Sequence, residues 1–559
     1  MIDDGPVPAQ GPDGVQLEIW WSRLTSIVDE AARAMLRTAF SAIIRESNDY
    51  TVVLMNRSGE RIADSRAGIP AFAVLIGALT QTLLGRFPAE TWQDGDCVIT
   101  NDPWIATGHL PDLAMISPVF HRARLVAYVG TAAHLPDIGG AATMGPTELS
   151  AEGLFIPPVH LHRAGRINDE LVAVVRGNVR LADQVWGDIE AQLAAHSVCR
   201  RRTVEYLEDA GEVGFETLAA AAHSKADQAM RRAISELPDG RYVSTLDADG
   251  IPGRPTHIEC SITVSGDELD VDYAGSSGQV THAINSTLNY TTAYTLYPLK
   301  LVLDPHTRSN DGTYRAISVT APIGSILNPR FPAPVLARHL TGHLLSCAIY
   351  RSLADALPDR VIADSGGAPA LRVHFAGRDE HGESFGLLLF ASGGMGASAG
   401  RDGLSTTAFP TNSGAGGVEV LESAGPLLFT RKEFRVDSAG AGCHRGGLGQ
   451  DVEVRNVGAS PVRVTLLGDR EHHSPEGLMR GSPAGPASAR LSTGPRPSLK
   501  SVTELPPGAS VVLSFAGGGG YGPPHERDPS EIARDLAEGL ISLEASRHDY
   551  RSVGTEPIR

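Results

Sequence analysis

The chain has 559 residues, of which 42% are apolar, and its 48 lysines and arginines against 65 aspartates and glutamates give a formal net charge of −17. This length predicts several packed domains, and the ordinary apolar fraction excludes a disordered or collagen-like protein. The negative charge argues against nucleic acid and anionic membrane surfaces as partners, because both would repel the chain.

The N-terminal part of the sequence alternates helix and strand patterns. Apolar residues recur every three or four positions from Val15 to Glu46, which predicts one long amphipathic helix ending at Ser47-Asn48-Asp49. The elements predicted after it are a strand at 51–55, a helix at 69–87, strands at 97–100, 113–120 and 125–130, and a helical region at 183–237.

The pattern changes near residue 240. Short alternating segments at 242–246, 258–264 and 269–273 are separated by Asp and Gly, which is typical of antiparallel sheet. Glycine is frequent between 390 and 450, and a strand-like stretch at 502–515 leads to a glycine-rich turn and a helical tail at 529–550.

These patterns predict a mixed α+β fold with a helix-rich N-terminal half, which carries a metal-bearing hairpin, and an antiparallel β-rich C-terminal half. The expected regions are an N-terminal α/β metal-binding region at 1–240, a β-rich middle region at 241–481, a flexible Pro/Ser/Arg-rich loop at 482–501 and a C-terminal region at 502–559.

One tetrapeptide occurs twice, as His109-Leu-Pro-Asp112 and His134-Leu-Pro-Asp137, offset by 25 residues. The segment between the copies reads as a β-hairpin that turns at 121–124. The paired residue numbers of such a hairpin sum to about 245, which sets Asp112 beside Ala133 and brings the two copies together at one end.

Two imidazoles and one or two carboxylates at that end form a mixed nitrogen and oxygen ligand set, which suits Zn, Mn or Fe(II) rather than Ca or a thiolate site. His109, Asp112 and His134 are the candidate ligands, and Asp49, between a helix and a strand, could supply a fourth. Asp137 could be a ligand, a partner that orients His134, or a turn former. The alternative is that these side chains are simply solvated near turns.

A second polar cluster spans residues 435–449, where Arg445 and other charges lie among glycines that would let backbone amides approach a ligand. Arginine there would suit a carboxylate or phosphate group. The alternative is a glycine-rich crossing of tightly packed strands.

Three further patterns carry less weight. One is His160-Leu161-His162, whose strand alternation would aim both imidazoles at one face but which reads as structural or surface. Gly396-x-Ser398-x-Gly400 resembles a nucleophile elbow but lacks the apolar helix that should follow, and Gly517-x-Gly519-x-x-Gly522 is followed by two prolines instead of a dinucleotide-binding unit. No phosphate-binding loop of the G-x-x-x-x-G-K-[ST] type occurs, so any ATP dependence must come from another chain or an unfamiliar pocket.

The cysteines and the start of the chain bear on the compartment. The five cysteines lie far apart without a C-x-x-C pair, which disfavours a disulfide framework, and Met1 to Pro6 is acidic and lacks the features of a signal peptide. We therefore expect a cytoplasmic protein without membrane association.

Taken together, the motifs resemble the B-type subunit of the hydantoinase/oxoprolinase family, which includes subunits of N-methylhydantoinase, caprolactamase and acetone or acetophenone carboxylase. The matching motifs extend nearly end to end: Ser47-Asn-Asp49, Asn101-Asp-Pro103, Gly108 to Asp112, Asp137 to Gly140, Gly177 to Arg180, Asn310-Asp-Gly312, Arg338-His339, Arg435 to Gly442 and Tyr521-Gly522.

The resemblance implies a divalent transition metal (Zn, Mn or Fe) held by Asp49, His109, Asp112 and His134. It also implies a hetero-oligomer, in which ATP is bound by an A-type partner subunit that phosphorylates a carbonyl or amide oxygen. This chain would then open a cyclic amide such as hydantoin, 5-oxoproline or a lactam with activated water.

Asp137, Arg338 and Arg445 are the candidate catalytic residues. Two alternatives stay open: a subunit of an ATP-dependent ketone carboxylase, and a non-catalytic scaffold stapled by the metal. The chain has Leu135 and Phe72 where many hydantoinase-like relatives carry histidines, which leaves the choice between hydrolase and carboxylase open.

Overall fold

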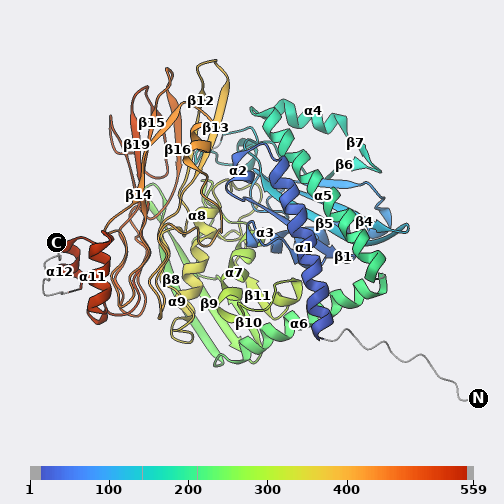
Figure 1. Cartoon of the computed structure of the whole chain (residues 1–559), viewed down its shortest axis with the longest axis horizontal. Coiled ribbons are helices and arrows are strands. Elements are labelled where there is room, and N and C mark those ends of the chain that lie inside the picture. Colours follow the sequence, from blue (N-terminus) through green and yellow to red (C-terminus); the bar gives the residue numbers. More distant parts are fainter. Residues whose placement is uncertain (1–13, 142, 211, 551–559) are drawn as a thin grey trace, which may run out of the picture.

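Seven antiparallel strands form the central sheet of the N-terminal half (Figure 1). Their order is β2 (Arg61–Asp64), β1 (Tyr50–Asn56), β5 (Arg124–His134), β4 (Asp112–His121), β3 (Cys97–Thr100), β6 (Val159–Arg163) and β7 (Arg166–Ile167). The computed structural model describes residues 14–141, 143–210 and 212–550; the acidic start of the chain, used above to argue against a signal peptide, lies outside them. Among these residues, every helix is too short or too polar to cross a bilayer.

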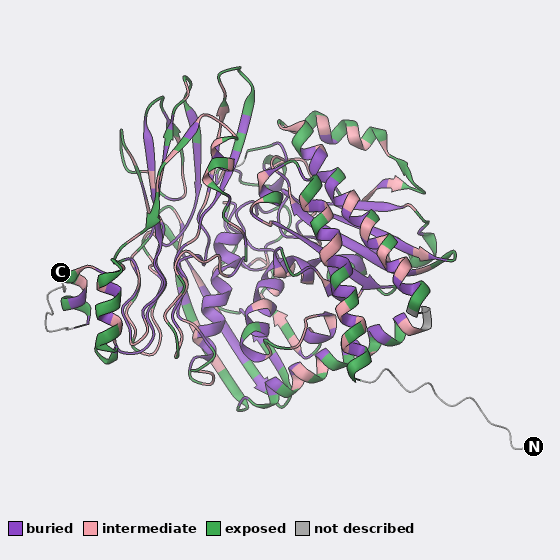
Figure 2. Cartoon of the chain, viewed as in Figure 1, coloured by how far each residue is buried: buried purple, intermediate pink, exposed green. Residues whose placement is uncertain are grey.

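Helices cover both faces of this sheet. The helices on one face are α1 (Gly14–Thr38), α5 (Ala182–Ala210) and α6 (Glu212–Ser235), and those on the other are α3 (Pro70–Arg86) and α7 (Leu288–Leu303). Strand β1 is buried along its length (Figure 2). Its apolar centre packs on both faces, Val52 and Leu54 against α1 and Val53 and Met55 against α3.

The single helix predicted for residues 15–46 is interrupted. Helix α1 ends at Thr38, and a separate short helix, α2 (Ala42–Arg45), follows. The cause is a carboxylate on α5: Asp188 Oδ1 accepts the backbone N–H groups of Phe40 (2.8 Å) and Ser41 (3.0 Å). This long-range contact redirects the chain toward Asp49, which immediately precedes β1.

The C-terminal half begins with a second sheet, as the change near residue 240 predicts. Its strands, in spatial order, are β11 (Ile317–Thr320), β10 (Glu268–Asp272), β9 (Arg254–Ser265) and β8 (Gly240–Ile251). The pair of β10 and β11 is parallel, so this half is not purely antiparallel. Helices α7, α8 (His339–Gly342) and α9 (Leu344–Leu353) were not predicted; α7 and α9 are mostly buried, and α7 lacks a clear polar face.

The remaining two sheets face each other as a sandwich (Figure 1). One has the order β13 (Ser384–Phe390), β12 (Arg372–Arg378), β16 (Val462–Leu467), β18 (Val502–Leu505); the other has β14 (Leu427–Phe434), β15 (Gln450–Asn456), β19 (Ser510–Ser514), β17 (Ser488–Leu491). Strand β17 and the buried Leu499 lie inside the segment predicted as a flexible loop, 482–501. That segment is therefore ordered by pairing with β19.

The helical tail predicted at 529–550 is confirmed as two helices, α11 (Pro529–Ala537) and α12 (Leu543–Asp549). These and the smaller elements complete the chain. The smaller elements are α4 (Asp169–Asn178), α10 (Val418–Glu422) and 3₁₀ turns at Ala89–Thr91, Leu149–Ala151, Asp311–Tyr314 and Pro524–Glu526. The expected mixed α+β class is thus confirmed.

The glycine-rich stretches form a bundle of extended segments beside the sandwich. Backbone amides bond directly between them, as in Gly447 N–H to Met395 O (2.8 Å) and Gly518 N–H to Gly447 O (2.9 Å). A Cβ atom built on Gly394 would lie 1.8 Å from Gly447 O, which leaves no room for any side chain. The glycines here allow close packing of backbones, which agrees with the strand-crossing interpretation of this region.

Replacing Gly394 by Ala should destabilise this bundle by about 1–3 kcal/mol or more, because the neighbouring backbone must move. Gly400 is a matched control in the same segment, since a Cβ atom there meets nothing within 4 Å. Thermal unfolding should show a clear loss for Gly394→Ala and almost none for Gly400→Ala. Equal melting temperatures for the two variants would contradict this packing.

Candidate active site

The duplicated tetrapeptide meets at one end of the hairpin of β4 and β5. Near the turn the predicted register holds, with His121 opposite Arg124, but a β-bulge between Val119 and Phe120 shifts the rest by one residue. Asp112 therefore pairs with His134, and the predicted pairing with Ala133 is wrong. The shift matters because directly paired residues share one face of a sheet.

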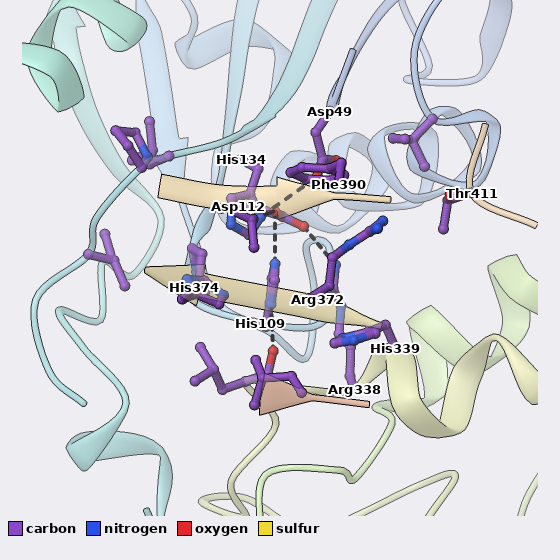
Figure 3. A pocket seen from close by; sticks show the side chains of 18 of the residues that line it. Asp49, His109, Asp112, His134, Arg338, His339, Arg372, His374, Phe390 and Thr411 are labelled. Carbon is purple, nitrogen blue, oxygen red and sulfur yellow. Dashed lines mark hydrogen bonds and ion pairs between the residues drawn. The ribbon is translucent and has the colours of Figure 1, made fainter. Parts of the chain in front are cut away.

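Three potential ligand atoms converge at this point (Figure 3). Asp112 Oδ1 lies 2.8 Å from His109 Nε2 and 2.8 Å from His134 Nδ1. We call His109, Asp112 and His134 the triad. Asp49 lies beside it, with Oδ2 4.0 Å from His134 Nδ1, and its backbone carbonyl accepts the His134 N–H at 3.0 Å. The structure thus brings together the four residues expected to bind a metal, three of them closely.

The protonation of His109 indicates what the triad can hold. Its Nδ1 must carry the proton, because it lies 2.9 Å from the Leu336 carbonyl, which can only accept. Burial lowers the pKa of His109 to about 4, so the ring is neutral at pH 7 and Nε2 has a lone pair. Nε2 is buried and lacks a donor among the described residues, and its neighbour is a carboxylate oxygen.

Asp112 is ionised in this site. Burial opposes the charge, but the Arg338 guanidinium and the hydrogen bond with His134 Nδ1 outweigh it and hold the pKa of Asp112 well below its usual range. Two lone pairs facing each other at 2.8 Å repel, and a divalent cation would bind both. The donor set therefore fits a Zn, Mn or Fe ion.

Arg338 is committed to the triad. Its NH2 group donates to Asp112 Oδ2 at 2.7 Å, its Nε donates to the Thr107 carbonyl at 2.6 Å, and its guanidinium lies 4.1 Å from the ring centre of Tyr290. Arg338 therefore orients Asp112, and few of its N–H donors remain available to a substrate.

A cavity of about 110 Å³ opens onto the triad, and both halves of the chain build it. The C-terminal half contributes side chains from α7 to α9 and from the outer face of β12 and β13: Tyr290, Tyr294, Arg338, His339, His343, Arg372, His374, Leu388 and Phe390. Sequence reasoning missed Arg372 and His374. The available signal was their spacing of two on a strand, which places both on one face, opposite the core residues Val373 and Phe375.

Of the residues predicted to be catalytic, some lie at the cavity and one does not. Asp137 lines the cavity, where its carboxylate accepts from Gly139 N–H (3.1 Å) and pairs with Arg180 (2.7 Å). Arg445 is not among the residues that line the cavity; it is buried in the C-terminal region, where its Nε lies 3.2 Å from Asp535. The structure therefore brings Asp137 and Arg338 to the triad but not Arg445.

Glu152 supports the triad from behind. Its Oε1 accepts the backbone N–H groups of Val335 (2.7 Å) and Leu336 (2.8 Å), and the Leu336 carbonyl in turn holds His109. Burial raises the pKa of Glu152 to about 8, although the backbone donors oppose this.

A pH dependence follows from that raised pKa. The folded protein keeps Glu152 protonated up to about pH 8, whereas the unfolded chain releases the proton near pH 4.5, so this group's stabilisation is complete below pH 4.5 and lost as the pH rises to 8. Glu152→Gln should remove this dependence. Between about pH 5 and about pH 8 the free energy of unfolding of the wild type should fall relative to the variant by up to about 4 kcal/mol. If the free energies of unfolding of the wild type and of Glu152→Gln differ by the same amount at both pH values, Glu152 does not have the raised pKa.

The model of the hydantoinase B/oxoprolinase family matches residues 13–524. The B subunit of a putative D-/L-hydantoinase from a Pseudomonas strain is 28% identical over 96% of this chain and 95% of its own length. The beta subunit of caprolactamase from Pseudomonas jessenii is 28% identical, with 97% and 96% coverage.

Two solved structures share the fold. A crystal structure of ATP-dependent caprolactamase from Pseudomonas jessenii superposes with a TM-score of 0.90, at 26% identity and 98% coverage of both chains. A nucleotide-free acetone carboxylase gives a TM-score of 0.87 at 20% identity, covering 96% of this chain and 79% of the other. The chain belongs to the hydantoinase B/oxoprolinase family.

Proposed function

We propose that this chain is the metal-dependent, ring-opening subunit of an ATP-dependent cyclic amide hydrolase, which acts on a hydantoin, 5-oxoproline or lactam ring. The observation that carries the proposal is the convergence of two imidazoles and a carboxylate on one point of a cavity. The similarity to the B subunit of a putative hydantoinase and to the beta subunit of caprolactamase supports the reaction class.

His109, Asp112 and His134, with Asp49 beside them, would hold the divalent ion. When bound, the ion would supply Lewis acidity toward water and toward a carbonyl oxygen. Arg338 keeps Asp112 ionised and oriented, and the Leu336 carbonyl keeps the His109 Nε2 lone pair directed at the site.

The cavity walls and Asp137 complete the proposed roles. Leu135, Leu388 and Phe390 line the cavity and limit its water, which strengthens the charge interactions inside it. Asp137 is a positioning residue in this proposal, because its bonds to Gly139 and Arg180 fix the loop that follows His134.

The proposal includes an A-type partner subunit. The sequence has no phosphate-binding loop motif, and two relatives are named as the B or the beta chain of a larger enzyme. The partner would bind ATP and phosphorylate the amide oxygen, which makes the ring carbon easier to attack.

The test is to purify the chain with an A-type subunit and to measure ADP and ring-opened product from hydantoin, 5-oxoproline and caprolactam. We expect ATP-dependent opening of at least one ring, and no ATP hydrolysis by this chain alone. ATP hydrolysis without any ring-opened product, across a panel of cyclic amides, would contradict the hydrolase assignment.

The second candidate is a subunit of a ketone carboxylase. It is supported by the delta subunit of acetophenone carboxylase from Aromatoleum aromaticum, which is 23% identical over 96% of this chain and 86% of its own length. Incorporation of radiolabelled bicarbonate into a ketone, by the same complex and with ATP, would select this candidate over ring opening.

A further inference from the structure

The cavity contains a second arginine, Arg372, whose charge has no partner in an ion pair. Among the residues that the structure describes, no carboxylate oxygen lies within 4.0 Å of its guanidinium, whereas Arg338 is held by Asp112 at 2.7 Å (Figure 3). The contacts of Arg372 are one hydrogen bond, from NH2 to Ser413 Oγ at 3.3 Å, and the ring of Phe390, whose centre lies 4.1 Å away.

Such an arginine is unusual inside a protein. A guanidinium carries five N–H donors in a planar fork, and one hydrogen bond leaves most of them open to the cavity. A buried or half-buried charge is normally paired, since removal of its water is costly. Stacking on Phe390 fixes the plane of the fork without using its donors.

The acidic groups of the cavity do not supply the missing partner. Asp112 is paired with Arg338, and Asp137 with Arg180. Asp49 interacts with Arg372 electrostatically, but its oxygens stay more than 4.0 Å from the guanidinium, and it lies 4.0 Å from His134. Arg372 therefore makes no direct ion pair within the described chain and keeps donors for an anion that enters the cavity.

A second polar group points to the same conclusion. His339 lines this cavity, is only 8% exposed, and its Nε2 has no hydrogen-bond partner among the described residues. A buried, unsatisfied ring nitrogen costs free energy unless a ligand bonds to it. The hydroxyl of Thr411, also on the cavity wall, holds Ser413 at 2.9 Å and so supports the one side chain to which Arg372 donates a hydrogen bond.

We propose that Arg372, together with His339, binds an anionic group of the substrate, a phosphoryl group or a carboxylate, in the cavity that contains the triad. This assignment deepens the proposed function and depends on it for the identity of the substrate. A planar guanidinium binds both kinds of oxyanion through paired hydrogen bonds. A phosphoryl group would belong to the activated amide, and a carboxylate would belong to a ring such as 5-oxoproline.

Binding to the full-length, metal-loaded chain tests the assignment without turnover. The probes are inorganic phosphate, 5-oxoproline and 2-pyrrolidinone, which is the same ring without the carboxylate; isothermal calorimetry measures their affinities. We expect phosphate or 5-oxoproline to bind the wild type and to bind Arg372→Gln about tenfold more weakly or worse, while 2-pyrrolidinone is unaffected. Selective loss of phosphate identifies the phosphoryl group, and selective loss of 5-oxoproline identifies the carboxylate.

Arg378→Gln is the matched control, because Arg378 lies at the exposed end of the same strand and, among the described residues, its side chain donates only to the Gly382 carbonyl. It should leave every affinity unchanged. If Arg372→Gln does not fold, Arg372→Lys replaces it and should bind the same anion at least about threefold more weakly, because the fork is lost. Equal anion binding by the wild type and the Arg372 variant, or no anion binding by the wild type, overturns the inference. If Arg372 binds the anion but the complex with the A-type partner opens no ring, the proposed function is refuted and the inference about Arg372 stands.

Discussion

Replacing Asp112 by Asn should abolish metal binding. Its Oδ1 is the atom that both His109 and His134 approach at 2.8 Å, so the substitution removes the charge at the centre of the triad. We expect the metal affinity to fall by more than about 100-fold, because changes even to residues behind metal ligands cost roughly 10- to 100-fold. Elemental analysis of purified protein measures this directly, with about one ion per chain expected in the wild type.

The same substitution leaves Arg338 without its counter-charge, which should cost about 3–5 kcal/mol of stability. Asp364→Asn is a matched control for that loss. Asp364 is equally buried and pairs with Arg351 at 2.6 Å and Arg470 at 3.3 Å, outside the cavity that contains the triad. Asp364→Asn should lower the melting temperature but keep the metal. Loss of metal in both variants would mean that unfolding, and not the triad, explains the result.

Arg338→Gln is expected to produce the second largest effect. Asp112 would then be a buried carboxylate without a cation, at a cost of about 3–5 kcal/mol. Because Arg338 orients the carboxylate without offering a metal ligand, the metal affinity should fall by about 10- to 100-fold and not vanish. Metal titration followed by calorimetry, with thermal unfolding of the same samples, separates the two effects.

Arg445→Gln provides the comparison for this variant. Arg445 is a buried arginine paired with Asp535 at 3.2 Å, outside the cavity. It should lose stability, although less than Arg338→Gln because Asp535 keeps its pair with Arg527 at 2.7 Å, and it should retain wild-type metal affinity. If Arg445→Gln weakens the metal as much as Arg338→Gln does, Arg338 has no particular role at the triad.

Local periodicity predicted much of the N-terminal half. The strand at 97–100, the helix at 69–87 and the hairpin are all present, because each follows from a pattern within one segment. The break after Thr38 could not be predicted, since it depends on Asp188, which lies about 150 positions further along. Helix α7 was not predicted for another reason. It is buried on most sides, so its sequence has no amphipathic pattern that would indicate a helix.

The part of the site that lies on the hairpin of β4 and β5 could be predicted from the sequence. The duplicated tetrapeptide indicated His109, Asp112 and His134. The β-bulge at Val119 changes which residues pair across the hairpin, and no feature of the local sequence predicts that bulge. On the opposite wall, Arg338 was a candidate only through the family resemblance, and Arg372 and His374 were missed because they reach the cavity from a strand that only the tertiary fold brings there.

The central claim is that ring opening depends on an ion held by the triad. The most direct measurement is the ring-opening rate of the complex with its A-type partner, before metal removal, after removal and after return of one equivalent of ion, with metal content determined on the same samples. The account predicts that activity disappears with the metal and returns with one ion per chain. Full activity in metal-free protein would contradict it.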